Sequence, residues 1–244
     1  MKLAVAGKGG AGKTTVSGTI ARALARSGQT VLALDADVNP MLGISLGVGP
    51  EETERLAAIR QALQEDAIDH AESVSELVER FGADAPDGVR LIITSRVDGI
   101  DSGCACCGVT PDGLLNELDD VDRAVVCDLE AGVGTLTKMN EGAVDVVLVV
   151  VNPTAKSIEV GRRAADSAVA KNAGVIVIAN RVQGPEDREA IESSFSAYEI
   201  VEVPEDSSVA RADREGIAPI DVDENGAGVS AIRTLLGRLP APAV

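Results

Sequence analysis

The sequence predicts an α/β fold with a doubly wound, mostly parallel sheet that is flanked by helices on both faces. Short apolar runs of strand length alternate along the chain with longer charged or amphipathic stretches. Polar residues and glycines follow several of these runs, at the strand ends where open parallel sheets bind ligands. Composition does not break anywhere in the 244 residues, so we expect a single domain over residues 1–244.

The first predicted strand, residues 3–6, leads into a glycine-rich loop. Residues 7–15 read G-K-G-G-A-G-K-T-T and precede a helical pattern over residues 16–25. A strand, a G-x-x-x-x-G-K-T turn and a helix N-terminus together form a phosphate loop, in which Lys13 reaches the β- and γ-phosphates and the Thr14 hydroxyl binds Mg²⁺. A flexible glycine turn is the plainer alternative. The predicted nucleotide contacts are Gly9, Gly10, Ala11, Gly12, Lys13, Thr14 and Thr15.

Two further predicted strands end in carboxylates. The second strand, 30–34, is followed by D-A-D-V-N-P, in which Asp37 is the candidate for chemistry and a turn-capping aspartate is the alternative. A third strand covers 89–94. The fourth, 123–127, ends at Asp128, which has the Walker B position that holds Mg²⁺ directly or through water. Cys127, inside this strand, is interpreted as a packing residue.

The remaining elements complete the sheet and its helices. Strands are expected at 144–151, 175–179 and 200–203, and the last two end at Asn180-Arg181 and Pro204-Glu205-Asp206. A helix follows Asn152-Pro153-Thr154, a surface helix covers 51–65, and a terminal helix covers about 229–239. Ser73 and Glu76 form a capping box that begins a further helix.

A second chemical motif is the cysteine loop, residues 103–108, with the sequence G-C-A-C-C-G. Cys104, Cys106 and Cys107 lie between glycines, and Pro111 begins a predicted helix that would lower thiolate pKa values. One C-x-C cannot supply four ligands, but two copies across a twofold axis could. Thiolates suit Ni²⁺, Zn²⁺, Cu(I) and iron–sulfur clusters alike. Buried structural cysteines are the alternative.

Composition excludes several classes of partner. Lys+Arg number 22 against Asp+Glu 39, a net charge of −17, and aromatic residues make up 1% of the chain. Such a chain lacks the cations and stacking platforms that nucleic acids need. A basic partner and a high-salt cytoplasm both remain compatible with this acidity. No secretory or transmembrane run is apparent, so we expect a cytoplasmic protein without a stable membrane anchor.

Taken together, these separated motifs resemble the MinD/ParA-like ATPases, which are SIMIBI-type P-loop NTPases with a deviant Walker A loop. The resemblance implies Mg²⁺-dependent ATP hydrolysis by a homodimer in which Lys8 reaches the partner's nucleotide. It also implies that Asp37 positions water or supports the Mg²⁺ shell, although Val38 replaces the usual proline after it. The same resemblance implies base or nucleotide contacts from Asn180, Arg181, Pro204, Glu205 and Asp206.

Within that family, the chain looks like the CooC-type accessory ATPases for nickel insertion into carbon monoxide dehydrogenase, which share the G-C-x-C loop. This resemblance implies that Cys104 and Cys106 of both protomers bind a metal that is delivered to a client metalloenzyme. Cys107 departs from the pattern and could join or replace a ligand. A MinD/ParA-type spatial-organising ATPase and an ATP-driven iron–sulfur reductase remain the alternative functions.

Overall fold

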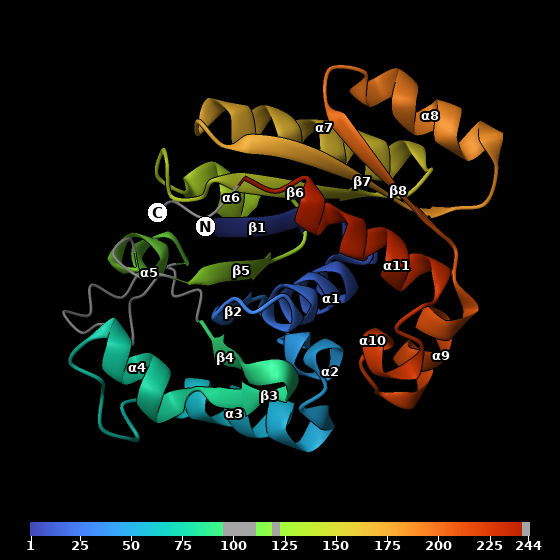
Figure 1. Cartoon of the computed structure of the whole chain (residues 1–244). Coiled ribbons are helices and arrows are strands. Elements are labelled where there is room, and N and C mark those ends of the chain that lie inside the picture. The colour runs from blue at the N-terminus through green and yellow to red at the C-terminus, as the bar shows by residue number, and fades with distance from the viewer. Residues whose placement is uncertain (95–110, 119–122, 241–244) are drawn as a thin grey trace.

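The computed structural model describes residues 1–94, 111–118 and 123–240. The strands are β1 Lys2–Gly7, β2 Val31–Ala36, β3 Ala83–Ala85, β4 Val89–Ile93, β5 Ala124–Leu129, β6 Val146–Val151, β7 Gly174–Val182 and β8 Glu199–Pro204. Within the described residues they form one eight-stranded sheet in the order β3-β4-β2-β5-β1-β6-β7-β8 (Figure 1). Every neighbouring pair is parallel except β3 with β4, so the predicted doubly wound, mostly parallel fold is confirmed.

Helices connect the strands and cover both faces of the sheet. They are α1 Lys13–Arg26, α2 Leu42–Leu46, α3 Gly49–Gln64, α4 Val74–Phe81, α5 Pro111–Glu117, α6 Gly134–Lys138, α7 Ala155–Ala170, α8 Pro185–Phe195, α9 Ser207–Glu215, α10 Pro219–Val222 and α11 Ala227–Arg233. Two 3₁₀ turns, η1 Pro86–Gly88 and η2 Thr234–Gly237, complete the described elements.

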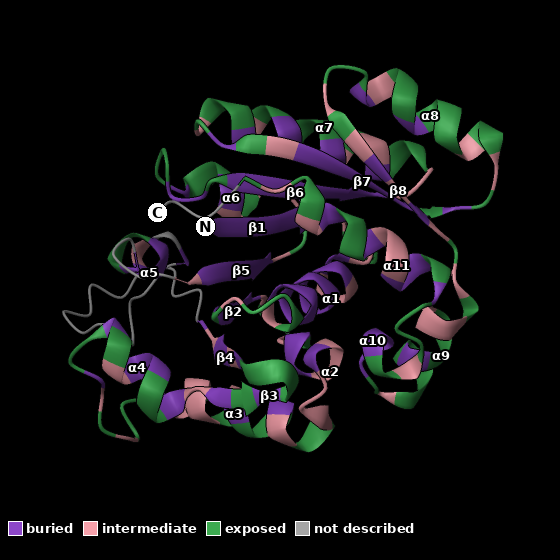
Figure 2. Ribbon diagram, in the orientation of Figure 1, coloured by how far each residue is buried: buried purple, intermediate pink, exposed green. Residues whose placement is uncertain are grey.

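Two apolar layers hold these helices against the sheet. One layer packs α4, α5, α6, α7 and α8 on one face, and the other packs α1, α2 and α11 on the opposite face. Alternate residues of the central strands point into alternate layers, as the strand period of two requires. Figure 2 shows the central strands buried and the outer helix faces exposed. The valine and leucine residues of β6, Val146–Val151, are all buried because this strand has packed helices on both sides.

Local sequence signals account for several boundaries. One half of the predicted capping box is present: the Ser73 hydroxyl accepts a hydrogen bond from the Glu76 N–H at 3.2 Å, and α4 begins there. The Glu76 carboxylate accepts instead from the Glu72 N–H, one residue before the N-cap, at 2.8 Å. The predicted terminal helix instead divides, because α11 ends at Arg233 and continues as a 3₁₀ turn. The antiparallel edge strand β3 is not predicted by the sequence, since three residues carry no usable pattern.

The topology brings the carboxyl ends of the parallel strands to one edge of the sheet. β1, β2, β5, β6, β7 and β8 all run in the same direction, so the polar segments that follow them meet along that edge. None of the helices that the structure describes has the length and apolar character of a membrane span.

Candidate functional site

The phosphate loop joins β1 to α1 and is shaped by three glycines with positive φ. Gly7, Gly10 and Gly12 have φ values of 149°, 77° and 101°, a region that other residues rarely adopt. Gly12 is the N-cap of α1, and a Cβ on it would fall on the Asn180 side chain. Inside the loop, the Ala11 N–H donates to the Lys8 carbonyl at 3.1 Å. Lys13, the first residue of α1, is buried at the base of this turn.

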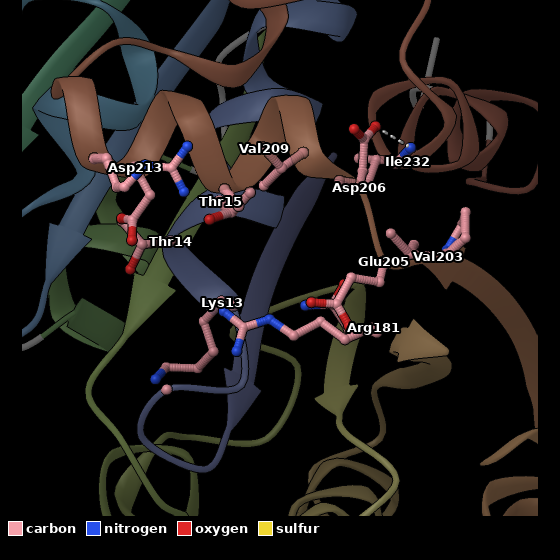
Figure 3. Close-up of a pocket in the computed structure, with 17 residues that line it drawn as sticks. Lys13, Thr14, Thr15, Arg181, Val203, Glu205, Asp206, Val209, Asp213 and Ile232 are labelled. Carbon is pink, nitrogen blue, oxygen red and sulfur yellow. Dashed lines mark hydrogen bonds between the residues drawn. The ribbon is translucent and has the colours of Figure 1, made fainter. Parts of the chain in front are cut away.

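A pocket of about 550 Å³ lies beside this loop. Its walls come from the loop and the start of α1, the end of β7, the segment after β8, and the helices α9 and α11 (Figure 3). Segments that are far apart in the sequence therefore share one cavity. Among the residues predicted from the sequence, those lining it are Gly10, Gly12, Lys13, Thr14, Thr15, Asn180, Arg181, Pro204, Glu205 and Asp206.

Two buried carboxylates lie side by side behind the loop. Asp35 on β2 and Asp128 on β5 are register partners, and their exposed fractions are 0% and 1%. Burial raises the pKa of Asp35, and the charge of Asp128 raises it further. Burial also raises the pKa of Asp128. Hydrogen bonds from Thr14 and Ser17, and the positive charge of Lys13, partly offset this rise. The pair therefore resists carrying two negative charges in the absence of a cation.

The donors around Asp128 fit a Mg²⁺ ion. Its carboxylate lies next to the Thr14 hydroxyl, and the Ser17 hydroxyl is 3.0 Å from Asp128 Oδ1. Oxygen donors of this kind, beside a phosphate loop, are the ligands that Mg²⁺ prefers. A divalent cation would also relieve the mutual repulsion of Asp35 and Asp128. Thr14 and Asp128 are thus the residues that would hold the ion.

Asp37 and Lys8 lie outside the pocket wall. Asp37 follows the end of β2, and its Oδ1 accepts a hydrogen bond from the Asn39 N–H at 3.0 Å, which folds the loop that leads to α2. The Arg60 guanidinium donates to the Asp37 carbonyl at 3.1 Å. The Lys8 ammonium lies 3.4 Å from the Gly9 carbonyl and is partly exposed. None of these described contacts holds the Asp37 or Lys8 side chain against the phosphate loop pocket.

The end of β7 combines a buried amide with an unusual backbone. Asn180 is 8% exposed, and its Nδ2 donates to the Ala11 carbonyl at 2.7 Å. Arg181 has a φ of 61°, and the pairing of β7 with β8 shifts register at this residue. A bulge of this kind re-aims a side chain. In Figure 3 the Arg181 side chain runs from the end of β7 toward the phosphate loop.

The segment after β8 forms the far wall of the pocket. Asp206 is the N-cap of α9, and its Oδ1 accepts from the Ser208 N–H at 2.8 Å. Its Oδ2 accepts from the Gly228 N–H, also at 2.8 Å (Figure 3). Partial burial opposes ionisation of Asp206, but a hydrogen bond from the Ser208 hydroxyl, together with those from the backbone N–H groups, lowers its pKa overall. Its carboxylate thus joins α9 to α11. Glu205 bonds instead to the side chain of Gln183.

Of the four cysteines in the chain, one lies in the part that the structure describes. Cys104, Cys106 and Cys107 lie outside the described residues. Cys127 is buried in β5, as its interpretation as a packing residue requires, and burial raises its pKa far above the ordinary thiol value. Over residues 1–94, 111–118 and 123–240, no group of three or more His, Cys, Asp or Glu side chains is placed to hold a metal ion.

Sequence reasoning missed part of the site. Ser17 touches Asp128 and is the residue one helical turn after Lys13, a position that helix geometry could have indicated. The D-x-D stretch contains both Asp35 and Asp37, and only the second is a candidate from the sequence. The apolar and charged lining from α9 and α11 has no local signal, and it comprises Val209, Ala210, Asp213, Arg214, Gly228 and Ile232.

A strand, glycine-rich loop and helix beside a pocket at the carboxyl edge of a parallel sheet define a phosphate-loop nucleotide-binding protein. Comparison with known proteins identifies the group more narrowly. The family model for the CbiA, or CobQ/CobB/MinD/ParA, nucleotide binding domain matches residues 2–220. The chain belongs to this family.

Individual relatives agree with that membership. The carbon monoxide dehydrogenase accessory protein CooC of Rhodospirillum rubrum is 29% identical over 240 residues, which cover 91% of this chain and 90% of that protein. An uncharacterized ATP-binding protein of Methanocaldococcus jannaschii is 30% identical, with 93% of each chain covered. The septum site-determining protein MinD of Pyrococcus horikoshii, solved with Mg-ADP, superposes with a TM-score of 0.70 at 18% identity over 98% of this chain and 96% of that one.

Proposed function

We propose that this protein is a Mg²⁺-dependent ATPase that closes as a homodimer over ATP and delivers a metal, nickel in the first instance, to a client metalloenzyme such as carbon monoxide dehydrogenase. The observation that carries the ATPase part is the pocket that joins the phosphate loop to the ends of β7 and β8. The similarity to CooC and the residues Cys104, Cys106 and Cys107 support the metal-delivery part.

In the proposed reaction, Lys13 and the N–H groups at the start of α1 bind the β- and γ-phosphates. Thr14 and Asp128 would hold Mg²⁺, and the ion when bound would supply positive charge to neutralise what develops on the phosphate oxygens. Asp37 orients the attacking water, and Lys8 adds a cation to the nucleotide site of the partner protomer. The Lys8 side chain is suited to that task because it lies at the loop surface and its described contact is with the neighbouring Gly9 carbonyl.

Closure over ATP would bring the cysteine loops of two protomers together. Two C-x-C pairs supply the four thiolates that a tetrahedral soft-metal site needs. Hydrolysis then removes the γ-phosphate contacts that favour closure, and the dimer reopens. Zn²⁺ or an iron–sulfur cluster would meet the same ligand chemistry as Ni²⁺, so the metal is to be determined by measurement.

Metal analysis of anaerobically purified protein, with and without Mg²⁺–ATP, tests this proposal. Wild type should retain about one metal ion per dimer, because four thiolates make one site. A Cys104→Ser/Cys106→Ser variant should lose this ion. Cys107→Ser, analysed separately, tests whether this third thiol is a ligand. Cys127→Ala is the matched control, because this buried thiol should not affect the metal content. Equal metal content in wild type and the double variant would contradict metal delivery and leave the ATPase assignment standing.

A spatial-organising ATPase is the second candidate, favoured by the MinD and ParA members of the matched family. Membrane-bound forms need an amphipathic helix with a free apolar face. Here the apolar residues of the terminal segment, Val229, Ile232 and Leu235, are buried against the protein itself. Co-sedimentation with anionic liposomes or DNA in the presence of ATP would favour this second function. A visible absorption band in anaerobic protein would instead favour an iron–sulfur reductase.

A further inference from the structure

The motif Asn152-Pro153-Thr154, with Ser157, has no role in the function proposed above. It follows β6, the strand next to β1, and is held in a defined turn. The Ser157 hydroxyl accepts a hydrogen bond from the Asn152 N–H at 2.9 Å, and Thr154 caps α7. Such a turn fixes the backbone from which the Asn152 side chain extends.

The Asn152 side chain is directed at the phosphate loop. Its Nδ2 lies 3.5 Å from the Gly10 carbonyl, a long hydrogen bond. Its Oδ1 is buried without a hydrogen-bond partner among the described residues. An unpaired buried acceptor is costly, so a turn that maintains this orientation is expected to have a compensating role. The N–H side of the amide, and not its oxygen, is the side presented to the loop.

Asn180 makes the matching contact from the next strand. Its Nδ2 donates to the Ala11 carbonyl at 2.7 Å, one residue along from the carbonyl that Asn152 approaches. The fit is close, because a Cβ on Gly12 would fall on the Asn180 amide nitrogen. Two carboxamides, at the carboxyl ends of the neighbouring strands β6 and β7, thus face two consecutive carbonyls of one loop.

We propose that Asn152 and Asn180 are positioning residues that hold the Gly10 and Ala11 carbonyls away from the phosphates. A carbonyl oxygen that turned inward would repel phosphate oxygens. In a trans peptide, C=O and N–H point in opposite directions, so fixing the Ala11 carbonyl also fixes the Gly12 N–H. Fixing the Gly10 carbonyl in the same way fixes the Ala11 N–H, which closes the turn onto Lys8.

This role adds to the base contact that the sequence implies for Asn180. A carboxamide has two N–H donors and one acceptor oxygen, so the bond to Ala11 does not exclude contact with a base. The two roles make different predictions. Loss of a residue that contacts only the base weakens binding of the nucleoside part of the ligand. Loss of a residue that positions the loop weakens binding of the triphosphate, whether or not a base is attached.

Binding of ATP and of inorganic tripolyphosphate, each with Mg²⁺, separates the two roles. We expect Asn180→Ala to weaken tripolyphosphate binding by about five- to tenfold, the loss of one hydrogen bond, and to weaken ATP binding by at least that factor, because any contact with the base is lost as well. Asn152→Ala should weaken both by about two- to fivefold, because its contact is longer. Amide hydrogen exchange should accelerate in residues 8–13 while the thermal midpoint stays near that of wild type. Asn225→Ala, an exposed asparagine before α11, is the matched control.

The outcomes are distinguishable. If wild type binds neither ATP nor tripolyphosphate, the proposed nucleotide site itself is wrong. If wild type binds both, and both variants bind tripolyphosphate as wild type does, the positioning role is wrong and Asn180 contacts only the nucleoside. If Asn180→Ala fails to fold, Asn152→Ala still tests the proposal, because Asn152 is only half-buried. Unchanged tripolyphosphate binding and unchanged hydrogen exchange of the loop in Asn152→Ala would show that the two carboxamides do not position the loop.

Discussion

Replacing Asp35 by asparagine should remove much of the pH dependence of stability in the nucleotide-free protein. Burial, followed by the charge of Asp128, raises the pKa of Asp35 to about 8. An unfolded aspartate titrates near 4, so between these values the folded protein holds a proton that the unfolded chain has released. That proton stabilises the folded state at low pH, and its contribution is lost as the pH rises through the folded-state pKa.

The size of the effect follows from the same linkage. Each pH unit inside this window changes the free energy of unfolding by about 1.4 kcal/mol, so wild type should lose on the order of 3 kcal/mol between pH 5 and pH 8. For a chain of this length that is a fall of roughly 10 °C in thermal midpoint. A carboxamide cannot ionise, and the Asp35→Asn variant should therefore lose much less over the same interval.

Thermal unfolding at pH 5, 6, 7 and 8, in EDTA and without nucleotide, measures this difference. Asp69→Asn is the matched control, because the Asp69 side chain is 97% exposed and its removal should leave the slope unchanged. Parallel pH profiles for wild type and Asp35→Asn would refute the reasoning, and so would a wild-type stability that rises from pH 5 to pH 8.

Three more predictions concern Asp128, the phosphate loop and the helix that follows the loop. Burial raises the pKa of Asp128 to about 6, so calorimetric Mg²⁺–ATP affinity should fall below pH 6, by up to about tenfold per unit. Arg22, 2% exposed, pairs with two carboxylates, and Arg22→Met should lower the free energy of unfolding in urea by about 2–4 kcal/mol. Its matched control is Arg26→Ala, which should cost less than about 1 kcal/mol because that side chain is 34% exposed. In Gly12→Ala the alanine would have to adopt a left-handed φ, and its added Cβ would clash with the Asn180 side chain. We therefore expect a fluorescent nucleotide to bind this variant at least about tenfold more weakly than wild type.

Features with a local cause were predictable from the sequence. The phosphate loop combines glycines, Lys13 and Thr14 in nine consecutive residues, and the physics of anion binding requires that combination. The buried strands are apolar runs, and α4 begins at the Ser73 N-cap. The N-cap role of Asp206 also has a local signal, because an aspartate directly before the first residue of a helix is a preferred N-cap.

Features that depend on strand order were not predictable in the same way. Asp35 and Asp128 are neighbours only because β2 lies beside β5 in the sheet, and nothing in either segment records that pairing. The contact between Asn180 and the Ala11 carbonyl likewise depends on β6 and β7 following β1. β3 forms by pairing with the free edge of β4, and a three-residue strand is too short to show a hydrophobic pattern in the sequence.

The segment that carries Asp37, residues 35–46, is anchored at both ends, and between them Arg60 donates to the Asp37 carbonyl. At its start, Asp35 Oδ2 accepts a hydrogen bond from the Leu42 N–H at 2.8 Å, which fixes the first residue of α2. At its end, Arg22 donates to the Leu46 carbonyl at 2.8 Å. Movement of Asp37 on binding Mg²⁺–ATP should therefore be confined to residues 36–41, because α2 is anchored to the buried carboxylate and to the phosphate-loop helix. Amide hydrogen exchange with and without Mg²⁺–ATP checks this, and an equal change across α2 would show that the anchors do not hold.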